Sequence, residues 1–142
     1  MPTNHDPFER QLAYSLFRAL FGLNLCMHGV ARILAGQSHF EAKITAQFAH
    51  TFFPHGFLVA FALALPWVEA ILGFLILAGL WTRTALVAAL LLMLVLTFGI
   101  CLVQNWPTAG LQLSYGIALA ALLFLLPYNR YSADSLLHST RT

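Results

Sequence analysis

The sequence contains very little charge. Asp, Glu, Lys and Arg make up only 8% of its 142 residues, whereas about a quarter of a soluble protein is charged, and 60% of the residues are hydrophobic. A chain of this composition cannot cover its surface with polar groups, so most of that surface is expected to face lipid. The small formal charge of +2 and the absence of any run of basic residues exclude an electrostatic surface for nucleic acid.

Residues that commonly bind metals or form disulfides are also scarce. Cys26 and Cys101 both lie inside apolar stretches, and no CxxC, zinc-ligand or haem-attachment motif occurs. Each thiol is expected to be a buried, inert side chain, and the sequence does not show whether the two meet. His39, His50 and His55 share no helical spacing, and a metal site needs several ligands, so no metal is expected.

Four long apolar stretches predict an all-α, polytopic membrane protein that folds as a four-transmembrane-helix bundle. A helical span needs about 20 mostly apolar residues, and these stretches are too long and uniform for β-barrel strands. No signal-peptide cleavage site follows the first stretch, which is therefore expected to stay in the mature chain. Short turns are expected at 82–84 and 104–110. The expected spans, within a single domain of residues 1–142, are 12–31, 56–81, 85–103 and 111–126.

The segment between the first two stretches is too polar to be a fifth span. Four bulky apolar residues recur there at every fourth position: Phe40, Ile44, Phe48 and Phe52. They would form one apolar stripe on a helix, and Ser38 with Glu41 has the spacing of a capping box. We expect an amphipathic helix over residues 38–52 that lies on the membrane or caps the bundle. An ordered loop with aromatic anchors is the alternative.

Lys and Arg are unevenly divided between the two ends of such a bundle. The end that holds the termini gathers Arg10, Arg83, Arg130 and Arg141, and the other end has Arg32 and Lys43. By the positive-inside rule, both termini are expected in the cytoplasm. The segment 32–55 and the turn at Trp106 then lie outside, and the expected location is a bacterial inner membrane.

The first two stretches carry a distinctive residue pattern. The first reads Arg18-x3-Gly22 and then His28-Gly29-x2-Arg32; the second reads Glu69-x3-Gly73 and then Gly79-Leu80-x-Thr82-Arg83. This pattern resembles the DoxX family of small four-helix membrane proteins, with Arg32 where that family commonly has Lys. The resemblance implies an accessory membrane subunit of a quinone-linked redox system, similar to the small subunit of a thiosulfate:quinone oxidoreductase. It favours such a subunit over a stand-alone enzyme.

Glu69 lies near the middle of its predicted span. An ionised side chain at the bilayer centre costs at least about 2.5–3.5 kcal/mol, so the carboxylate needs a partner, water or a proton. Arg18 is expected to reach it, because the two differ in depth by roughly 8 Å. The pair would either fix the packing of the two spans or leave Glu69 to handle protons or contact a quinone. Gly29, Gly73 and Gly79 are expected to let neighbouring helices approach closely.

A second polar set is expected near the outer end of the bundle. Its members are His28, Trp67, Gln104, Gln112 and Tyr115. Buried polar groups must find partners, so these residues either hydrogen-bond to one another and hold the helices together or line a pocket for a quinone head group. A quinone is the only cofactor that the residue types suggest.

Three functions stay open on the sequence alone. The leading one is the accessory subunit of a redox membrane complex. The second is a non-enzymatic scaffold or assembly subunit with protein partners in the membrane. The third is a small transporter, which would have to act as a homo-oligomer because four spans are few.

Overall fold

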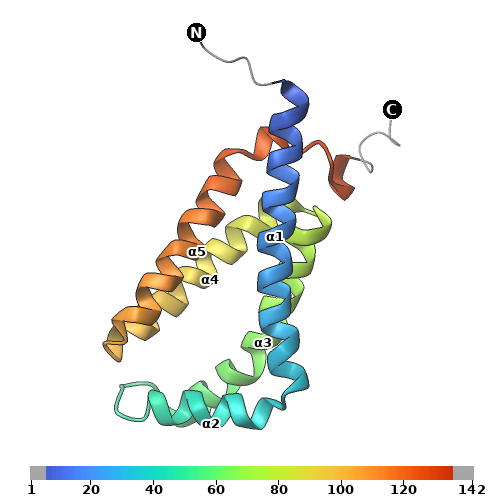
Figure 1. Cartoon of the computed structure of the whole chain (residues 1–142). Coiled ribbons are helices and arrows are strands. Elements are labelled where there is room, and N and C mark those ends of the chain that lie inside the picture. Colours follow the sequence, from blue (N-terminus) through green and yellow to red (C-terminus); the bar gives the residue numbers. More distant parts are fainter. Residues whose placement is uncertain (1–5, 136–142) are drawn as a thin grey trace.

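The computed structural model describes residues 6–135, and within this range the chain is entirely helical (Figure 1). Its elements in order are α1 (Pro7–Leu34), α2 (Gln37–Gln47), α3 (His55–Ala78), α4 (Thr82–Leu102), α5 (Trp106–Phe124) and the short 3-10 helix η1 (Leu126–Tyr128). The predicted all-α class is confirmed, as is the presence of a further helix between the first two apolar stretches.

Three of these helices are long and apolar enough to cross a membrane: α3, α4 and α5. Only 33%, 22% and 11% of their most apolar windows are buried inside the protein, so most of their apolar surface faces outward, as in helices surrounded by lipid. Helix α1 passes the same test only together with α2, across a bend of 102°. The predicted count of four separate spans is thus not confirmed: three helices pass the test singly, whereas Arg18, Asn24 and His28 interrupt the apolar sequence of α1.

Helices α1 and α3 pack antiparallel with their backbones in contact. A Cβ atom added at Gly22, Gly29 or Gly73 would come closer than 3.0 Å to backbone atoms of the opposite helix. Gly22 faces Leu77, Gly29 faces Ala70, and Gly73 faces Cys26, so the three glycines fix one register along the pair. Only residues without a side chain permit this approach.

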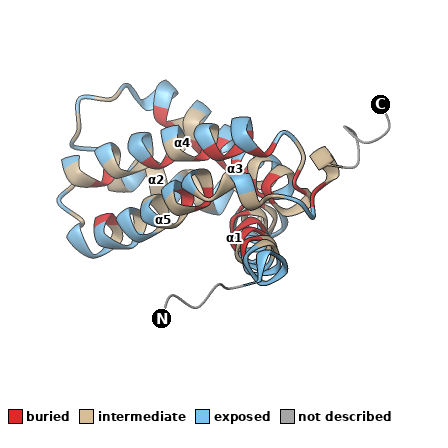
Figure 2. Cartoon of the chain, turned by 90° about the horizontal axis from the view of Figure 1, so that it is seen from above, coloured by how far each residue is buried: buried red, intermediate tan, exposed pale blue. Residues whose placement is uncertain are grey.

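Helices α4 and α5 form a second pair, which diverges from α1 and α3 towards α2 (Figure 1). The main apolar core lies at the end where α1 begins, here called the terminal end. Its fully buried members are Ile76, Leu86, Leu119 and Leu122. A smaller cluster at the α2 end contains Phe48, Leu58, Ile100 and Ala109. Figure 2 shows exposed residues along the outward faces of α4 and α5.

The turn between α3 and α4 comes earlier than the sequence predicted. Gly79 (φ 69°) and Trp81 (φ 46°) adopt left-handed conformations, so Thr82 already begins α4. The Asp134 carboxylate accepts hydrogen bonds from the backbone N–H of Trp81 (2.7 Å) and from the backbone N–H (2.9 Å) and hydroxyl (2.8 Å) of Thr82. This side chain caps α4 from 52 residues away along the chain, which local sequence reading cannot detect.

The helix predicted at 38–52 is shorter than expected. Helix α2 ends at Gln47, and Phe52 lies in the following loop, 71% exposed. Gly36 (φ 94°) precedes the helix in the N-cap position without a side-chain cap, so the predicted Ser38 capping box is wrong. Helix α2 lies across the end of the bundle opposite the end where α1 begins (Figure 1).

Helix α5 begins earlier than the predicted span at 111–126. The Asn105 side chain accepts a hydrogen bond from the backbone N–H of Thr108 (3.3 Å), and Pro107 stands in the first turn, where a missing N–H costs nothing. The breakers expected to form a long turn therefore start the helix instead.

Candidate functional site

A cavity of about 430 Å³ lies between the two helix pairs, next to α2. All five α-helices contribute to its lining. Its walls are largely aromatic, with Phe21, Phe40, Phe53, Phe57, Phe61 and Phe98 among them. Its polar side chains include Asn24, His28, Arg32, Lys43, Glu69 and Gln112. An apolar cavity of this size with a few polar groups has the character of a small-molecule site.

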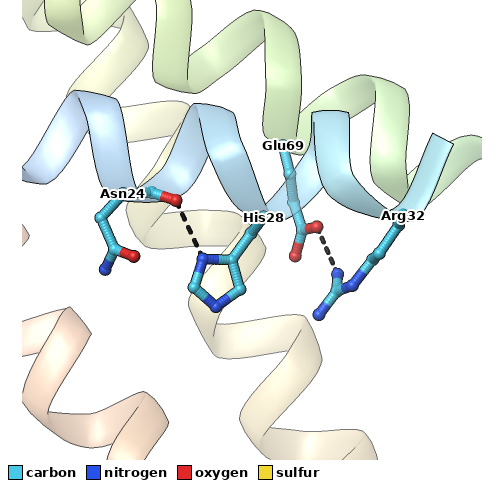
Figure 3. A network of polar contacts seen from close by, with 4 residues as sticks. All are labelled: Asn24, His28, Arg32 and Glu69. Carbon is cyan, nitrogen blue, oxygen red and sulfur yellow. Dashed lines mark hydrogen bonds and ion pairs between the residues drawn. The ribbon is translucent and has the colours of Figure 1, made fainter. Parts of the chain in front are cut away.

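An ion pair between α1 and α3 borders the cavity (Figure 3). Arg32 Nη1 donates to Glu69 Oε2, and the side chains are 31% and 5% exposed. The Arg32 guanidinium also lies 4.6 Å from the ring centroid of Phe40 on α2, within the range of a cation–π contact. The buried carboxylate is therefore neutralised at the edge of the cavity by an arginine that α2 helps to hold.

The predicted pairing of Arg18 with Glu69 is wrong. The Arg18 side chain is buried and donates to three carbonyl oxygens: those of Ile76 (2.5 Å), Leu77 (2.7 Å) and Tyr131 (2.9 Å). It thus ties the end of α3 to the segment after η1. The close contacts at the glycines align α1 and α3 so that Arg32 lies beside Glu69. The estimate that placed Arg18 near Glu69 had assumed that the two predicted spans have their cytoplasmic ends at the same depth in the membrane.

His28 presents one ring nitrogen to the cavity. Its Nδ1 lies 2.9 Å from the carbonyl oxygen of Asn24, one helical turn earlier (Figure 3). A carbonyl oxygen only accepts, so Nδ1 donates to it, and in the neutral ring Nε2 is then an acceptor. Within residues 6–135, no group donates to Nε2. The ring also meets Tyr115 on α5 edge to face, with centroids 6.3 Å apart.

Gln112 and Tyr115 face the cavity from α5. The Gln112 side-chain oxygen is buried and lacks a hydrogen-bond partner in the described part of the chain. The Tyr115 ring packs at a steep angle against Phe21 on α1, with centroids 6.0 Å apart. Polar groups on α1 and α5 therefore line one space from opposite sides.

Three of the five residues predicted to form a polar pocket line this cavity: His28, Gln112 and Tyr115. Trp67 does not, because it is two residues from Glu69 and so projects from another face of α3, where it is 53% exposed. Gln104 does not either, since it occupies the turn after α4 with φ 54°. The sequence reading missed Asn24 and Lys43; Asn24 precedes His28 by one turn, which places both on the same face.

The remaining residues of the sequence motif do not line the cavity. Gly73 packs on the backbone of Cys26, and Gly79 ends α3 in a left-handed conformation beside the Arg18 guanidinium. Arg83 is exposed in the first turn of α4. Cys26 and Cys101 are both free thiols and are partly buried. Among residues 6–135, no cluster of His, Cys, Asp or Glu could hold a metal ion.

Comparison with known families gives one match. The family model described as methylamine utilisation protein MauE matches residues 10–109, which run from α1 into the first turn of α5 and include the Arg32–Glu69 pair. No curated protein and no solved structure matches the chain.

This match overturns the resemblance to DoxX, which is a different family of membrane proteins. The residues that suggested it have general causes in the structure. Gly73 allows close packing of two antiparallel helices, and Gly79 closes a helix before a short turn. Unrelated helical hairpins can share such features, so the thiosulfate and quinone chemistry implied by the resemblance loses that basis.

Proposed function

The chain belongs to the MauE family of methylamine utilisation proteins, and on that premise we propose that it is an integral membrane accessory protein of a methylamine utilisation system. The match over residues 10–109 is the observation that carries this proposal. Use of methylamine as a nutrient requires oxidation of its carbon, so the role is redox-linked. The protein acts on or beside a partner of that system and does not itself turn over methylamine.

The shape of the protein supports an accessory role. Helices α3, α4 and α5 are apolar enough to span a membrane and expose most of their apolar surface. Within residues 6–135, the segments between helices are short and form no separate soluble unit. Contacts with a protein partner would therefore involve the lipid-facing helices or the two ends of the bundle.

The distribution of charge supports an orientation with the terminal end in the cytoplasm. Arg10 lies near the start of α1, Arg83 in the first turn of α4 and Arg130 after η1, which places all three at the terminal end. Arg32 in the last turn of α1 and Lys43 on α2 lie at the other end. Cytoplasmic ends of membrane helices carry the excess of Lys and Arg, so we assign α2 to the outer side of a bacterial inner membrane.

Growth tests this function. In the organism that encodes the chain, an in-frame deletion is compared with the parent on methylamine and on a nutrient that bypasses methylamine. Loss of growth on methylamine alone, restored by the full chain, is expected. Uptake of labelled methylamine should stay at the parental level; a loss of uptake would indicate transport instead. Unchanged growth on methylamine would refute the proposal.

Thiol labelling tests the orientation. In a chain whose two native cysteines are replaced by serine, single variants His50→Cys and Arg83→Cys are treated with a membrane-impermeant maleimide in intact cells. His50 lies in the exposed loop after α2 and should react at once. Arg83→Cys should react only after the cells are permeabilised. The reverse pattern would refute the assignment.

A further inference from the structure

The cavity borders on the lateral surface of the bundle. Four of its lining residues are also exposed apolar side chains, each 51–56% exposed: Phe57, Val95, Phe98 and Leu111. They come from α3, α4 and α5, the helices that are apolar enough to span a membrane. A molecule dissolved in the bilayer can therefore reach the cavity without entering water.

Two hydrogen-bond acceptors face this space without donors. His28 offers Nε2 from α1, because its Nδ1 already donates to the Asn24 carbonyl. Gln112 offers its side-chain oxygen from α5, buried and unpaired within the described residues. Of the two cationic donors in the lining, Arg32 is engaged by Glu69, and Lys43 on α2 is an exposed side chain. The Gln112 oxygen is an unpaired buried acceptor, which is unfavourable, and His28 is an exposed side chain of the same lining. The fitting occupant is therefore one that brings hydroxyl or N–H donors.

The charge and shape of the cavity walls further restrict which molecules can bind there. Arg32 and Glu69 neutralise each other, and Lys43 adds one positive charge, so a cationic amine is disfavoured. Phe53, Phe57 and Phe61 form a ladder of nearly parallel rings, with centroids 5.3 and 6.1 Å apart, on the α3 side of the lining. Such a wall suits a flat ring that packs against aromatic faces.

From these observations we infer that the cavity binds a membrane amphiphile whose head is a neutral, hydroxyl-bearing ring on an apolar tail, the chemistry of a hydroquinone. One ring hydroxyl donates to His28 Nε2 and another donor reaches Gln112. The oxidised quinone has only acceptors at these positions and is the weaker ligand. The site is inferred for binding alone. It is independent of the accessory role, because binding is measured on purified protein and the accessory role by growth.

The test uses the purified full chain in lipid nanodiscs under anaerobic conditions. Decylubiquinol and its oxidised form, decylubiquinone, are titrated by calorimetry, with methylammonium chloride and a short-chain phosphatidylglycerol as the other probes. The quinol should bind about ten- to a hundredfold more tightly than the quinone, since it gains two hydrogen bonds that each contribute at most about a factor of ten. His28→Phe and Gln112→Leu should each weaken quinol binding by up to about tenfold.

Matched variants separate binding from folding. Gln11→Leu and His55→Phe make the same changes outside the cavity lining and should leave quinol binding unchanged. Gln112→Leu removes an unpaired buried amide oxygen, so the melting temperature of this variant without ligand should be equal to or above that of the parent. Binding of neither quinol nor quinone, equal binding of both, or loss of binding in the control variants would overturn the inference. Tighter binding of phosphatidylglycerol or methylammonium would overturn it as well.

Discussion

The contact between the backbones of α1 and α3 makes a sharp prediction about Gly73. A Cβ at this position would lie closer than 3.0 Å to the N and Cα atoms of Cys26 and to the carbonyl carbon of Leu25. These are backbone atoms, which cannot rotate away as the end of a flexible side chain can. In Gly73→Ala the two helices must therefore separate at their closest point.

The size of the effect follows from two opposing contributions. Ordinary contact begins at 3.4 Å, so the helices must part by about 1 Å, and overpacking of this kind costs about 1–3 kcal/mol, here near 3 because nothing can yield. The higher helix propensity of alanine stabilises the folded state by about 1 kcal/mol. The net loss for Gly73→Ala is about 2 kcal/mol. Gly116→Ala, where no atom lies within 4 Å, should gain up to about 1 kcal/mol.

Reversible unfolding in mixed micelles measures this difference. Helicity is followed by circular dichroism while the mole fraction of SDS is raised, for the parent, Gly73→Ala and the matched control Gly116→Ala. Gly73→Ala should be less stable than the parent and Gly116→Ala more stable. Their free energies of unfolding should differ by about 3 kcal/mol, the sum of the expected loss and gain. If Gly73→Ala is as stable as Gly116→Ala, the α1–α3 register described above is incorrect.

Three further predictions concern polar contacts and use the same unfolding assay. Arg32→Met should destabilise the protein by about 3 kcal/mol, the low end for a broken buried pair, because Arg32 is partly exposed. The double variant Arg32→Met with Glu69→Met should recover most of this loss, and equal stability of the single and double variants would contradict the ion pair. Asp134→Ala should cost about 1–2 kcal/mol through loss of the α4 cap, and an unchanged midpoint would show that the cap contributes nothing. Arg18→Lys should also be less stable, because an ammonium cannot reproduce the planar set of donors to three carbonyls; a fully stable lysine variant would refute this role.

The apolar stretches predicted much of the fold. Helices α3, α4 and α5 lie where long runs of hydrophobic residues were expected to span, because the length of an apolar run directly reflects the thickness of the bilayer. The helix boundaries were less accurate. Residue 82 was placed in a turn because the cap that starts α4 comes from Asp134, which is distant in sequence.

The candidate site shows where reasoning from one residue at a time fails. Arg18 was paired with Glu69 from their estimated depths, although the glycines that fix the register had been identified. Had Gly29 been set against Ala70 and Gly73 against Cys26, Arg32 would have come next to Glu69 without a structure. His28, Gln112 and Tyr115 were grouped correctly by level in the bundle, whereas Trp67 was not, because its level says nothing about the face from which it projects.

The cap on α4 also has a consequence for the order in which the protein is made. Asp134 follows Thr82 by 52 residues, so α4 and α5 have both been synthesised before the carboxylate that secures the α3–α4 turn exists. The glycine contacts of α1 with α3, in contrast, can form as soon as α3 has been synthesised. During biogenesis the α1–α3 contacts can thus form first, whereas the N-terminus of α4 has no Asp134 cap until α5 has been synthesised.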